Sequence, residues 1–173
     1  MILNDNEVIN YILDMKDLKI IQRPDYFNFS LDSILLANFL TINRTVKKIM
    51  DLGTGNGIIP ILLTKKSKAH ISAIELQEVS ADLAHRNIEL NNLKDRVTII
   101  NDNMLHYKKY FEDETFDDIT CNPPFFKLDG NSAQLNNLDQ LTIARHEISI
   151  NLDGIVEVAS KLLRNRGYFA MVH

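Results

Sequence analysis

The chain has 173 residues, of which 45% are hydrophobic and 24% are charged, and its formal net charge is -4. These values suit a single globular domain that needs neither disulfides nor metal ions to hold it together. No apolar run is long enough to span a bilayer, the N-terminus lacks a signal-peptide pattern, and the one cysteine, Cys121, allows no intrachain disulfide. We therefore expect a cytoplasmic protein, whose acidic charge does not favour nucleic acid as a partner.

Residues 1–43 form an N-terminal segment that does not follow the regular pattern of the rest of the chain. A helix is predicted over Glu7–Met15, then a strand over Leu18–Gln22 and a helix from about Leu31 to Leu40. We therefore divide the sequence into this segment and a main domain at residues 44–173.

Short β-branched runs alternate with helical stretches through the main domain. The predicted strands are Lys48–Asp51, His70–Glu75, Val97–Ile100, Phe116–Cys121 and Gly167–Val172, and the predicted helices are Ile58–Lys66, Gln77–Asn91 and Ile150–Leu163. This alternation predicts an α/β fold with a doubly wound, mainly parallel, Rossmann-like sheet. Within the second of these helices, the apolar stripe consists of Val79, Leu83, Ile88 and Leu90.

Two features stand out in the C-terminal third. The stretch Phe126–Ile148 is rich in Asn, Asp and Gln and follows a double proline, so we expect a mobile loop of the kind that often forms a lid. His173 comes directly after the last predicted strand, which would leave an open edge. We therefore expect the chain to be truncated at its C-terminus, with further strands beyond it.

A glycine-rich segment, Asp51–Gly57, joins the first strand of the main domain to its first helix. Glycines permit a sharp turn with positive φ and a close approach of the backbone to a ligand. The spacing Gly-x-Gly-x-Gly differs from the Gly-x-Gly-x-x-Gly of dinucleotide enzymes. Asp51 would repel a pyrophosphate, but it can interact with the cationic amino-acid end of S-adenosylmethionine. The segment therefore predicts a site for this cofactor, lined by Gly53, Gly55 and Gly57.

Acidic residues also end the next two predicted strands. Glu75 lies about 20 residues beyond the glycines, where a carboxylate can accept hydrogen bonds from ribose hydroxyls. Asp102 follows the third strand, from which it can reach the adenine amino group. Ligands of open α/β sheets bind at the carboxyl ends of the strands, so we assign both acids to the cofactor site. The alternative for each residue alone is a helix N-terminal acid for Glu75 and a loop cap for Asp102.

The fourth predicted strand is followed by the turn Asn122-Pro123-Pro124-Phe125. The prolines restrict the backbone, so that the Pro123 carbonyl and the Asn122 side-chain carbonyl are two fixed acceptors. Two adjacent acceptors suit an NH2 group, and Phe125 can stack on the planar system that carries it. The acceptors would also stabilise positive charge on nitrogen as a methyl group arrives. We predict Asn122, Pro123, Pro124 and Phe125 as catalytic residues; the alternative is a structural turn with a buried Phe.

Asp51–Gly57 together with Asn122–Phe125 resembles the class I amino-methyltransferases of Rossmann-like fold, whose fourth motif is Asn/Asp/Ser-Pro-Pro-aromatic. Gln22–Ala37, Ala144–Glu147 and Gly167–His173 are similar to segments of the bacterial tRNA1(Val) (adenine(37)-N6)-methyltransferases. The resemblance covers nearly the whole chain. It implies S-adenosylmethionine as cofactor, no metal, and methylation of the N6 amino group of an adenine beside the anticodon of a valine tRNA.

The resemblance also implies a role for the N-terminal segment. In that family the segment folds over the cofactor, so residues 1–43 are expected to cap the cofactor and substrate. It adds Arg23, Phe29 and Asp32 to the cofactor-binding set, which also includes Asn122. Arg23 can equally be a surface residue and Phe29 a core residue. RNA, and tRNA in particular, is thus the expected partner, and the sequence does not fix the oligomeric state.

Other functions remain open alternatives. A guanine N2 rRNA methyltransferase or a protein-glutamine N5-methyltransferase shares the Asn-Pro-Pro turn, although the latter usually carries a helical substrate domain that this short N-terminal segment cannot supply. A non-catalytic S-adenosylmethionine-binding partner subunit is an alternative of another class, but it has no need of an intact Asn-Pro-Pro-Phe turn. The glycine spacing disfavours a nicotinamide-dependent oxidoreductase.

Overall fold

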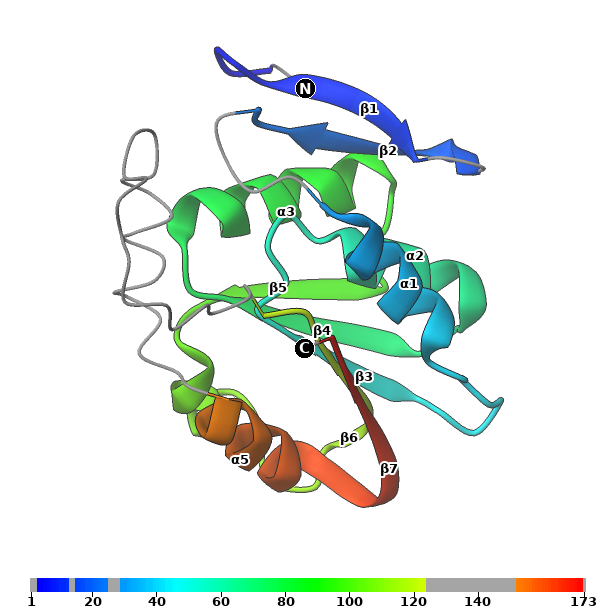
Figure 1. Ribbon diagram of the computed structural model, residues 1–173, viewed down its shortest axis with the longest axis vertical. Coiled ribbons are helices and arrows are strands. Elements are labelled where there is room, and N and C mark those ends of the chain that lie inside the picture. Colours follow the sequence, from blue (N-terminus) through cyan, green and yellow to red (C-terminus); the bar gives the residue numbers. More distant parts are fainter. Residues whose placement is uncertain (1–2, 13–14, 25–28, 124–151, 173) are drawn as a thin grey trace, which may run out of the picture.

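The computed structural model describes residues 3–12, 15–24, 29–123 and 152–172. Predictions about Pro124, Phe125, the loop at 126–148 and the short motif at 144–147 lie outside the described residues. Over the rest, a parallel sheet carries helices on both faces, and a separate two-stranded sheet lies outside one layer of helices (Figure 1). The predicted α/β fold class is confirmed.

The main sheet has five strands in the order β5-β4-β3-β6-β7. Their bounds are β3 Lys48–Leu52, β4 His70–Glu75, β5 Val97–Asn101, β6 Phe116–Cys121 and β7 Leu163–Met171. Every neighbouring pair is parallel. All five strands predicted for the main domain are therefore present, and their carboxyl ends meet along one edge of the sheet.

Helices cover both faces of this sheet and create two hydrophobic cores. On one face lie α1 (Leu31–Phe39), α2 (Ile58–Lys66) and α3 (Glu78–Leu90), and on the other lie the short 3-10 helix η1 (Met104–Lys109) and α5 (Leu152–Leu162) (Figure 1). Side chains alternate between the faces, so Ile49 joins the first core while Met50 and Leu52 join the second. Because both faces are covered, the central strands β3 and β4 are buried at every residue except the first.

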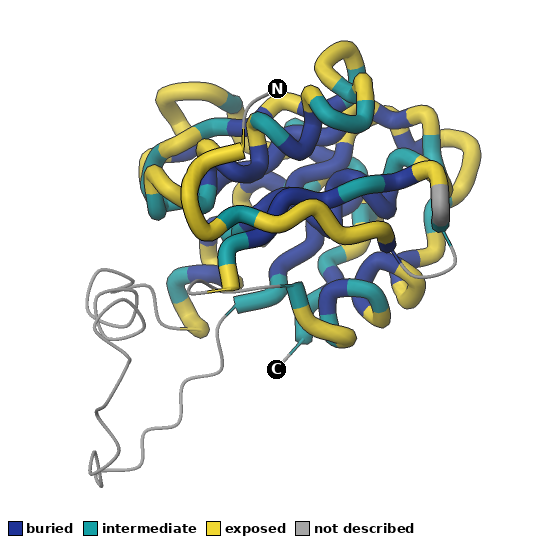
Figure 2. The backbone as a smooth tube through the Cα atoms, turned by 90° about the horizontal axis from the view of Figure 1, so that it is seen from above, coloured by how far each residue is buried: buried dark blue, intermediate teal, exposed yellow. Residues whose placement is uncertain are grey.

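The predicted helix at Glu7–Met15 is wrong, because this segment belongs to an antiparallel hairpin. Its strands are β1 (Val8–Ile12) and β2 (Met15–Gln22). Four of the five residues of β1 are exposed, and only Ile12 is buried. Its β-branched and aromatic side chains favour extended backbone, which pairing with β2 satisfies. Figure 2, which views the molecule from the hairpin side, shows buried residues beneath an exposed outer strand.

The hairpin is attached to α3 by two asparagines one helical turn apart. Asn87 is fully buried; its Oδ1 accepts from the Ile21 amide at 2.6 Å and its Nδ2 donates to the Ile21 carbonyl at 3.1 Å. Asn91 forms the same pair of bonds with Lys19, at 3.0 and 2.7 Å. Side-chain amides of a helix thereby satisfy backbone groups along the free edge of β2, as a neighbouring strand would.

The predicted apolar stripe of α3 is partly wrong. Leu83 and Ile88 are buried, but Val79 is 36% exposed and Leu90 is only partly buried. The remaining buried positions are Ala81, Ala84 and Asn87. Small side chains face the sheet because the glycine-rich segment approaches α3 closely: a Cβ on Gly57 would lie 3.2 Å from the Cβ of Ala84.

The last strand begins four residues earlier than predicted, at Leu163 rather than Gly167. The pairing of β6 with β7 shifts register between Phe116 and Asp118, and Arg166 adopts a left-handed conformation with φ of 67°. A Cβ on Gly167 would lie 2.4 Å from the carbonyl oxygen of Asp117, so glycine is needed where the chain crosses that backbone. No helix among the described residues is long and apolar enough to cross a membrane.

Candidate functional site

The predicted site residues converge on the edge where the parallel strands end. Asp51 lies near the end of β3 and Glu75 is the last residue of β4. Asp102 follows β5 by one residue, and Asn122 directly follows β6. Because β5, β4, β3 and β6 are consecutive neighbours, these residues lie in a row along the region where α/β folds bind ligands.

The glycine-rich segment after β3 is held against the end of β4. The amides of Gly53 and Thr54 both donate to the Ile74 carbonyl, at 2.9 and 3.1 Å. Gly53, Gly55 and Gly57 have φ values of 68°, 57° and 82°, in the left-handed region that glycine adopts more readily than any residue with a Cβ. A Cβ on Gly55 would meet no atom within 4 Å, so the backbone borders open space there.

Glu75 connects this segment to the start of α3. One carboxylate oxygen accepts from the Gly55 amide and the other from the Gln77 amide, each at 2.8 Å. Burial raises the pKa of the Glu75 carboxyl, and these backbone hydrogen bonds oppose that rise. The Leu76 amide also stabilises the ionised carboxylate, whose two oxygens have about four lone pairs between them and can still accept from a ribose hydroxyl.

Asp51 is fully buried with one of its oxygens lacking a partner. Oδ1 accepts a hydrogen bond from the Thr120 hydroxyl at 2.6 Å, whereas Oδ2 has none. Burial raises the pKa of this carboxyl to about 7, and the charge of Glu75 adds to the rise. The Nδ2 of Asn56, in the adjacent glycine-rich segment, also lacks a partner. A buried acceptor and donor of this kind fit a polar, partly cationic ligand.

Asp102 occupies the predicted place, but its carboxylate is already saturated. Oδ1 accepts from the Asn103 amide and from His106 Nδ1, each at 2.7 Å. Oδ2 accepts from Lys109 Nζ at 2.9 Å and from the Tyr110 hydroxyl at 2.8 Å. These bonds, above all the one from His106, hold the pKa of the carboxyl well below its usual value. A contact to an adenine amino group would therefore require one of these donors to move.

Asn122 is bonded to the N-terminal segment across 89 positions of sequence. Its Nδ2 donates to the hydroxyl oxygen of Ser33, on α1, at 2.9 Å. Pro123 is half-buried beside it. Cys121, just before the turn, is buried, and burial raises the pKa of its thiol far above the usual range, which argues against a nucleophilic role.

The three residues taken from the N-terminal signature are placed differently from one another. Arg23 is half-buried immediately after β2. Phe29 packs against the core formed with α1, α2 and α3, which agrees with the alternative of a core residue. Asp32 lies in the first turn of α1, where it accepts from the Ser30 hydroxyl at 3.4 Å and is adjacent to Ser33. Ser33, the next residue along α1 from Asp32, contacts Asn122.

Three side chains at or next to this edge escaped prediction from the sequence. Thr120 and Ser33 bond directly to predicted residues, and Asn87 donates to the Asn56 carbonyl at 2.9 Å, which links the glycine-rich segment to the hairpin. Thr120 lies two residues before Asn122 near the end of the same strand, so its closeness to the site could have been predicted from the sequence. Ser33 and Asn87 carry no such signal, because their partners are distant in sequence.

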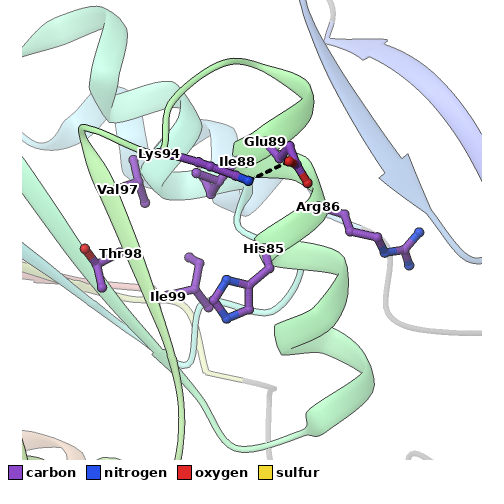
Figure 3. A pocket seen from close by; sticks show the side chains of 8 residues that line it. All are labelled: His85, Arg86, Ile88, Glu89, Lys94, Val97, Thr98 and Ile99. Atoms are coloured by element: carbon purple, nitrogen blue, oxygen red, sulfur yellow. Dashed lines mark hydrogen bonds and ion pairs between the residues drawn. The ribbon is translucent and has the colours of Figure 1, made fainter. Parts of the chain in front are cut away.

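The structure was also searched for metal-binding groups and for pockets outside this edge. Within the described ranges, no group of three or more His, Cys, Asp or Glu side chains is arranged to hold a metal ion. A pocket of about 310 Å³ lies between α3 and β5 (Figure 3). It is lined by His85, Arg86, Ile88, Glu89, Lys94, Val97, Thr98 and Ile99. Its residues are not among those predicted for the site.

Comparisons with known proteins give one family for this architecture. The profile of the methyltransferase small domain family matches residues 28–173. A protein of Aliivibrio fischeri (strain ATCC 700601 / ES114), named tRNA1(Val) (adenine(37)-N6)-methyltransferase, is 32% identical over 139 residues, which cover 80% of this chain and 56% of that protein. A protein of Bacteroides thetaiotaomicron with the same name is 30% identical over 143 residues, covering 82% and 57%. The chain spans about half the length of these curated relatives.

Solved structures agree on the fold. A transferase from Pyrococcus horikoshii superposes with a TM-score of 0.62 at 15% identity, over 94% of this chain and 50% of that one. An S-adenosylmethionine-dependent methyltransferase from Thiobacillus denitrificans, solved with S-adenosylhomocysteine, superposes with a TM-score of 0.57 at 17% identity, over 83% and 48%. The predicted Rossmann-like class I methyltransferase fold is thereby confirmed.

Proposed function

We propose, from the premise that the chain belongs to the methyltransferase small domain family, that it transfers a methyl group from S-adenosylmethionine to the N6 amino group of an adenine in tRNA. One observation carries the proposal: the glycine-rich segment after β3 and the Asn122 turn after β6 end two neighbouring strands. A methyl donor bound at the glycine-rich segment and an amine bound at the Asn122 turn would meet at one edge of the sheet.

The chain's own residues fit the methyl donor. The open space beside Gly55 admits a ligand against the backbone, and the unpartnered Oδ2 of Asp51 can accept from an ammonium group. Glu75 holds the segment in shape while keeping lone pairs for ribose hydroxyls. Asn56 adds an unpartnered donor nearby. When bound, S-adenosylmethionine supplies an electrophilic methyl group on a sulfonium.

Asn122 and Pro123 act on the acceptor nitrogen. The side-chain carbonyl of Asn122 and the main-chain carbonyl of Pro123 would accept the two N–H groups of an exocyclic amine, which directs the nitrogen lone pair towards the methyl carbon. With S-adenosylmethionine bound, the sulfonium would be the leaving group, and the two carbonyls would hold the nitrogen facing the methyl carbon until one N–H proton leaves to solvent. The two carbonyls stabilise the positive charge that develops on nitrogen, so no strong general base is required.

The assignment of adenine in tRNA rests on the names of the relatives, which describe action at adenine 37 of tRNA1(Val). The base would have to leave its stack to reach the turn. We extend the proposal to the position beside the anticodon of a valine tRNA, to a capping role for residues 1–43, and to the cytoplasm as the place of action. Phe125 would stack on the extruded base, with Arg23 and Asp32 near the cofactor.

The test uses the full-length protein, S-adenosylmethionine and bulk tRNA from a strain that lacks the gene. Nucleoside mass spectrometry should then detect N6-methyladenosine in the tRNA. Asn122→Ala should lower the rate at least about 100-fold, because it removes an acceptor that acts in the transition state. The same variant should bind S-adenosylhomocysteine within a few-fold of wild type.

Different outcomes would identify the alternatives. Methyl transfer to rRNA or to protein glutamine, with no methylated adenosine in tRNA, would overturn the substrate assignment. Binding of S-adenosylhomocysteine without transfer to any acceptor would favour a non-catalytic partner subunit. Full activity of Asn122→Ala would mean that the Asn-Pro-Pro turn is structural.

A further inference from the structure

The side chain of Asn122 works only in one orientation. Its amide has an acceptor end, Oδ1, and a donor end, Nδ2. An exocyclic amine presents N–H groups, so Oδ1 must face it; the reverse orientation would set two donors against each other. The turn by itself does not decide between the two, because rotation about the last side-chain bond exchanges the ends. Something outside the turn has to fix the amide.

Ser33 is the group that contacts the donor end. Its hydroxyl oxygen accepts the hydrogen bond from Asn122 Nδ2 at 2.9 Å, and Ser33 itself is only 4% exposed. The two amide atoms share one trigonal carbon, so holding Nδ2 at α1 directs Oδ1 away from the helix. In the structure the Ser33 hydroxyl, which can also donate, serves as the acceptor, so the donor end of the amide lies at α1 before any substrate arrives.

The position of Ser33 is itself fixed by the packing of α1. Leu36 and Ala37, on the same helix, are 2% and 1% exposed in the core shared with α2. The end of α1 is held by Lys66, on α2, whose Nζ donates to the carbonyls of Ala37, Asn38 and Leu40 at 2.7, 2.8 and 2.7 Å. Ser33 therefore lies on a helix whose position is set by core packing and by the contacts of Lys66.

We propose that Ser33 is a positioning residue for methyl transfer: its hydroxyl oxygen holds Asn122 Nδ2 so that Oδ1 faces the acceptor amine. The role of Ser33 in methyl transfer rests on the proposed function, whereas its contact with Asn122 does not. Ser33 acts through Asn122 and touches neither donor nor acceptor. In this role α1 contributes to the site of the amine that accepts the methyl group, in addition to the capping role proposed for residues 1–43. Preorganisation of this kind lowers the barrier without tightening ground-state binding.

The kinetic test compares Ser33→Ala with Ser33→Thr in the full-length protein. Ser33→Ala should lower kcat about 10-fold, the order expected for one hydrogen bond to an oriented group. Its KM for tRNA and its affinity for S-adenosylhomocysteine should stay within about 2-fold of wild type, because uniform binding is untouched. Ser33→Thr keeps the hydroxyl and should recover most of kcat. Ser72→Ala, which removes a buried hydroxyl from the middle of β4, is the matched control and should keep wild-type kcat.

A double-mutant cycle separates positioning from general damage. If Ser33 acts through Asn122, Ser33→Ala should have no further effect on the rate in an Asn122→Ala background. Independent, multiplicative losses would overturn the proposal. So would a Ser33→Ala variant that loses cofactor affinity in proportion to kcat, or one with wild-type kcat.

A spectroscopic measurement tests the contact without RNA. In ¹⁵N-labelled protein, the Asn122 side-chain NH2 resonance, assigned by its loss in Asn122→Asp, should shift and exchange faster with solvent in Ser33→Ala but not in Ser33→Thr. An unchanged resonance in Ser33→Ala would refute the contact even if the chain methylates another acceptor. Absence of N6-methyladenosine with wild-type protein, by contrast, would refute only the proposed substrate.

Discussion

Asp51 is a buried carboxyl whose ionised form the ligand-free fold stabilises only in part, through hydrogen bonds from threonine side chains. Its unperturbed pKa is 3.8 and burial raises the pKa to about 7 in the fold. A carboxyl with a raised pKa binds a proton more tightly when folded, so its contribution to stability is fully present below pH 3.8 and is lost as pH rises towards 7. The fold accepts this cost where the proposed ligand brings a cation.

Binding of S-adenosylhomocysteine, which carries the same amino-acid end, should therefore release a proton near pH 6, because the ammonium favours the ionised form of Asp51. Affinity should rise by up to about tenfold per pH unit below the pKa of about 7 and level off above it. Calorimetry in buffers of different ionisation enthalpy measures the protons released.

Asp51→Asn is the control for this linkage, since Glu75 is a second buried carboxyl with a raised pKa nearby. The variant should bind more weakly at pH 8 and show little dependence of binding enthalpy on the buffer. If wild-type binding released no proton near pH 6, Asp51 would not be the group that contacts the ammonium.

Single residues also show what could be predicted from sequence and what could not. Asp51, Glu75 and Asn122 were found because each follows from a motif and a strand end that lie together in the chain. Ser33 and Asn87 were not, because their partners are 89 and 66 positions away. For Asp102 the position is predicted but its three side-chain donors are not, since they depend on how η1 folds back.

Among the elements, the buried strands were predictable and the hairpin was not. Strands β4 and β6 have the predicted bounds, and every residue of the two strands except His70 and Asp117 is buried. Strand β1 exposes four of five residues, so burial leaves little pattern in its sequence. Its extended form depends on pairing with β2, and β2 depends in turn on side chains of α3. A helix prediction from a short stretch of sequence takes account of neither β2 nor the side chains of α3.

Asn87 should be the residue on which the hairpin most depends. Asn87→Ala would leave the backbone amide and carbonyl of Ile21 and the carbonyl of Asn56 without partners in a buried setting. We expect the free energy of unfolding to fall by about 2–4 kcal/mol, several times the value of one exposed hydrogen bond. Urea denaturation followed by circular dichroism measures this change.

Asn91→Ala is the matched control one turn along α3. It removes the equivalent bonds to Lys19, but in a part-buried setting where water can replace them. Its cost should be about 1 kcal/mol. Equal losses for the two variants would show that the hairpin depends on its overall packing and not on the buried amide.

At the scale of the whole molecule, charge is distributed unevenly although the net charge is -4. The acidic residues of the site lie at the carboxyl edge of the sheet. The helix η1 follows β5 at the same edge, where Lys108 is exposed and Lys109 forms an ion pair with Asp102. An RNA that delivers a base to Asn122 must approach this edge. Exposed cations there can contact phosphate, whereas those at the amino edge cannot contact the same RNA segment.

The comparison of Lys108 with Lys68 tests this direction of approach. Lys108 has 71% of its side chain exposed; its Nζ lies 3.7 Å from a carboxylate oxygen of Asp113 and 6.0 Å from the centroid of the Tyr107 ring. Lys68 is exposed between α2 and β4, at the amino edge of the sheet. Lys108→Glu should raise KM for tRNA about 5- to 10-fold at about 0.1 M salt and lower the salt slope by about one, with kcat at saturating tRNA unchanged. Lys68→Glu makes the same change in net charge and should leave KM within about 2-fold. Equal effects from both variants would mean that overall charge, and not approach to the carboxyl edge, governs binding of the proposed RNA substrate.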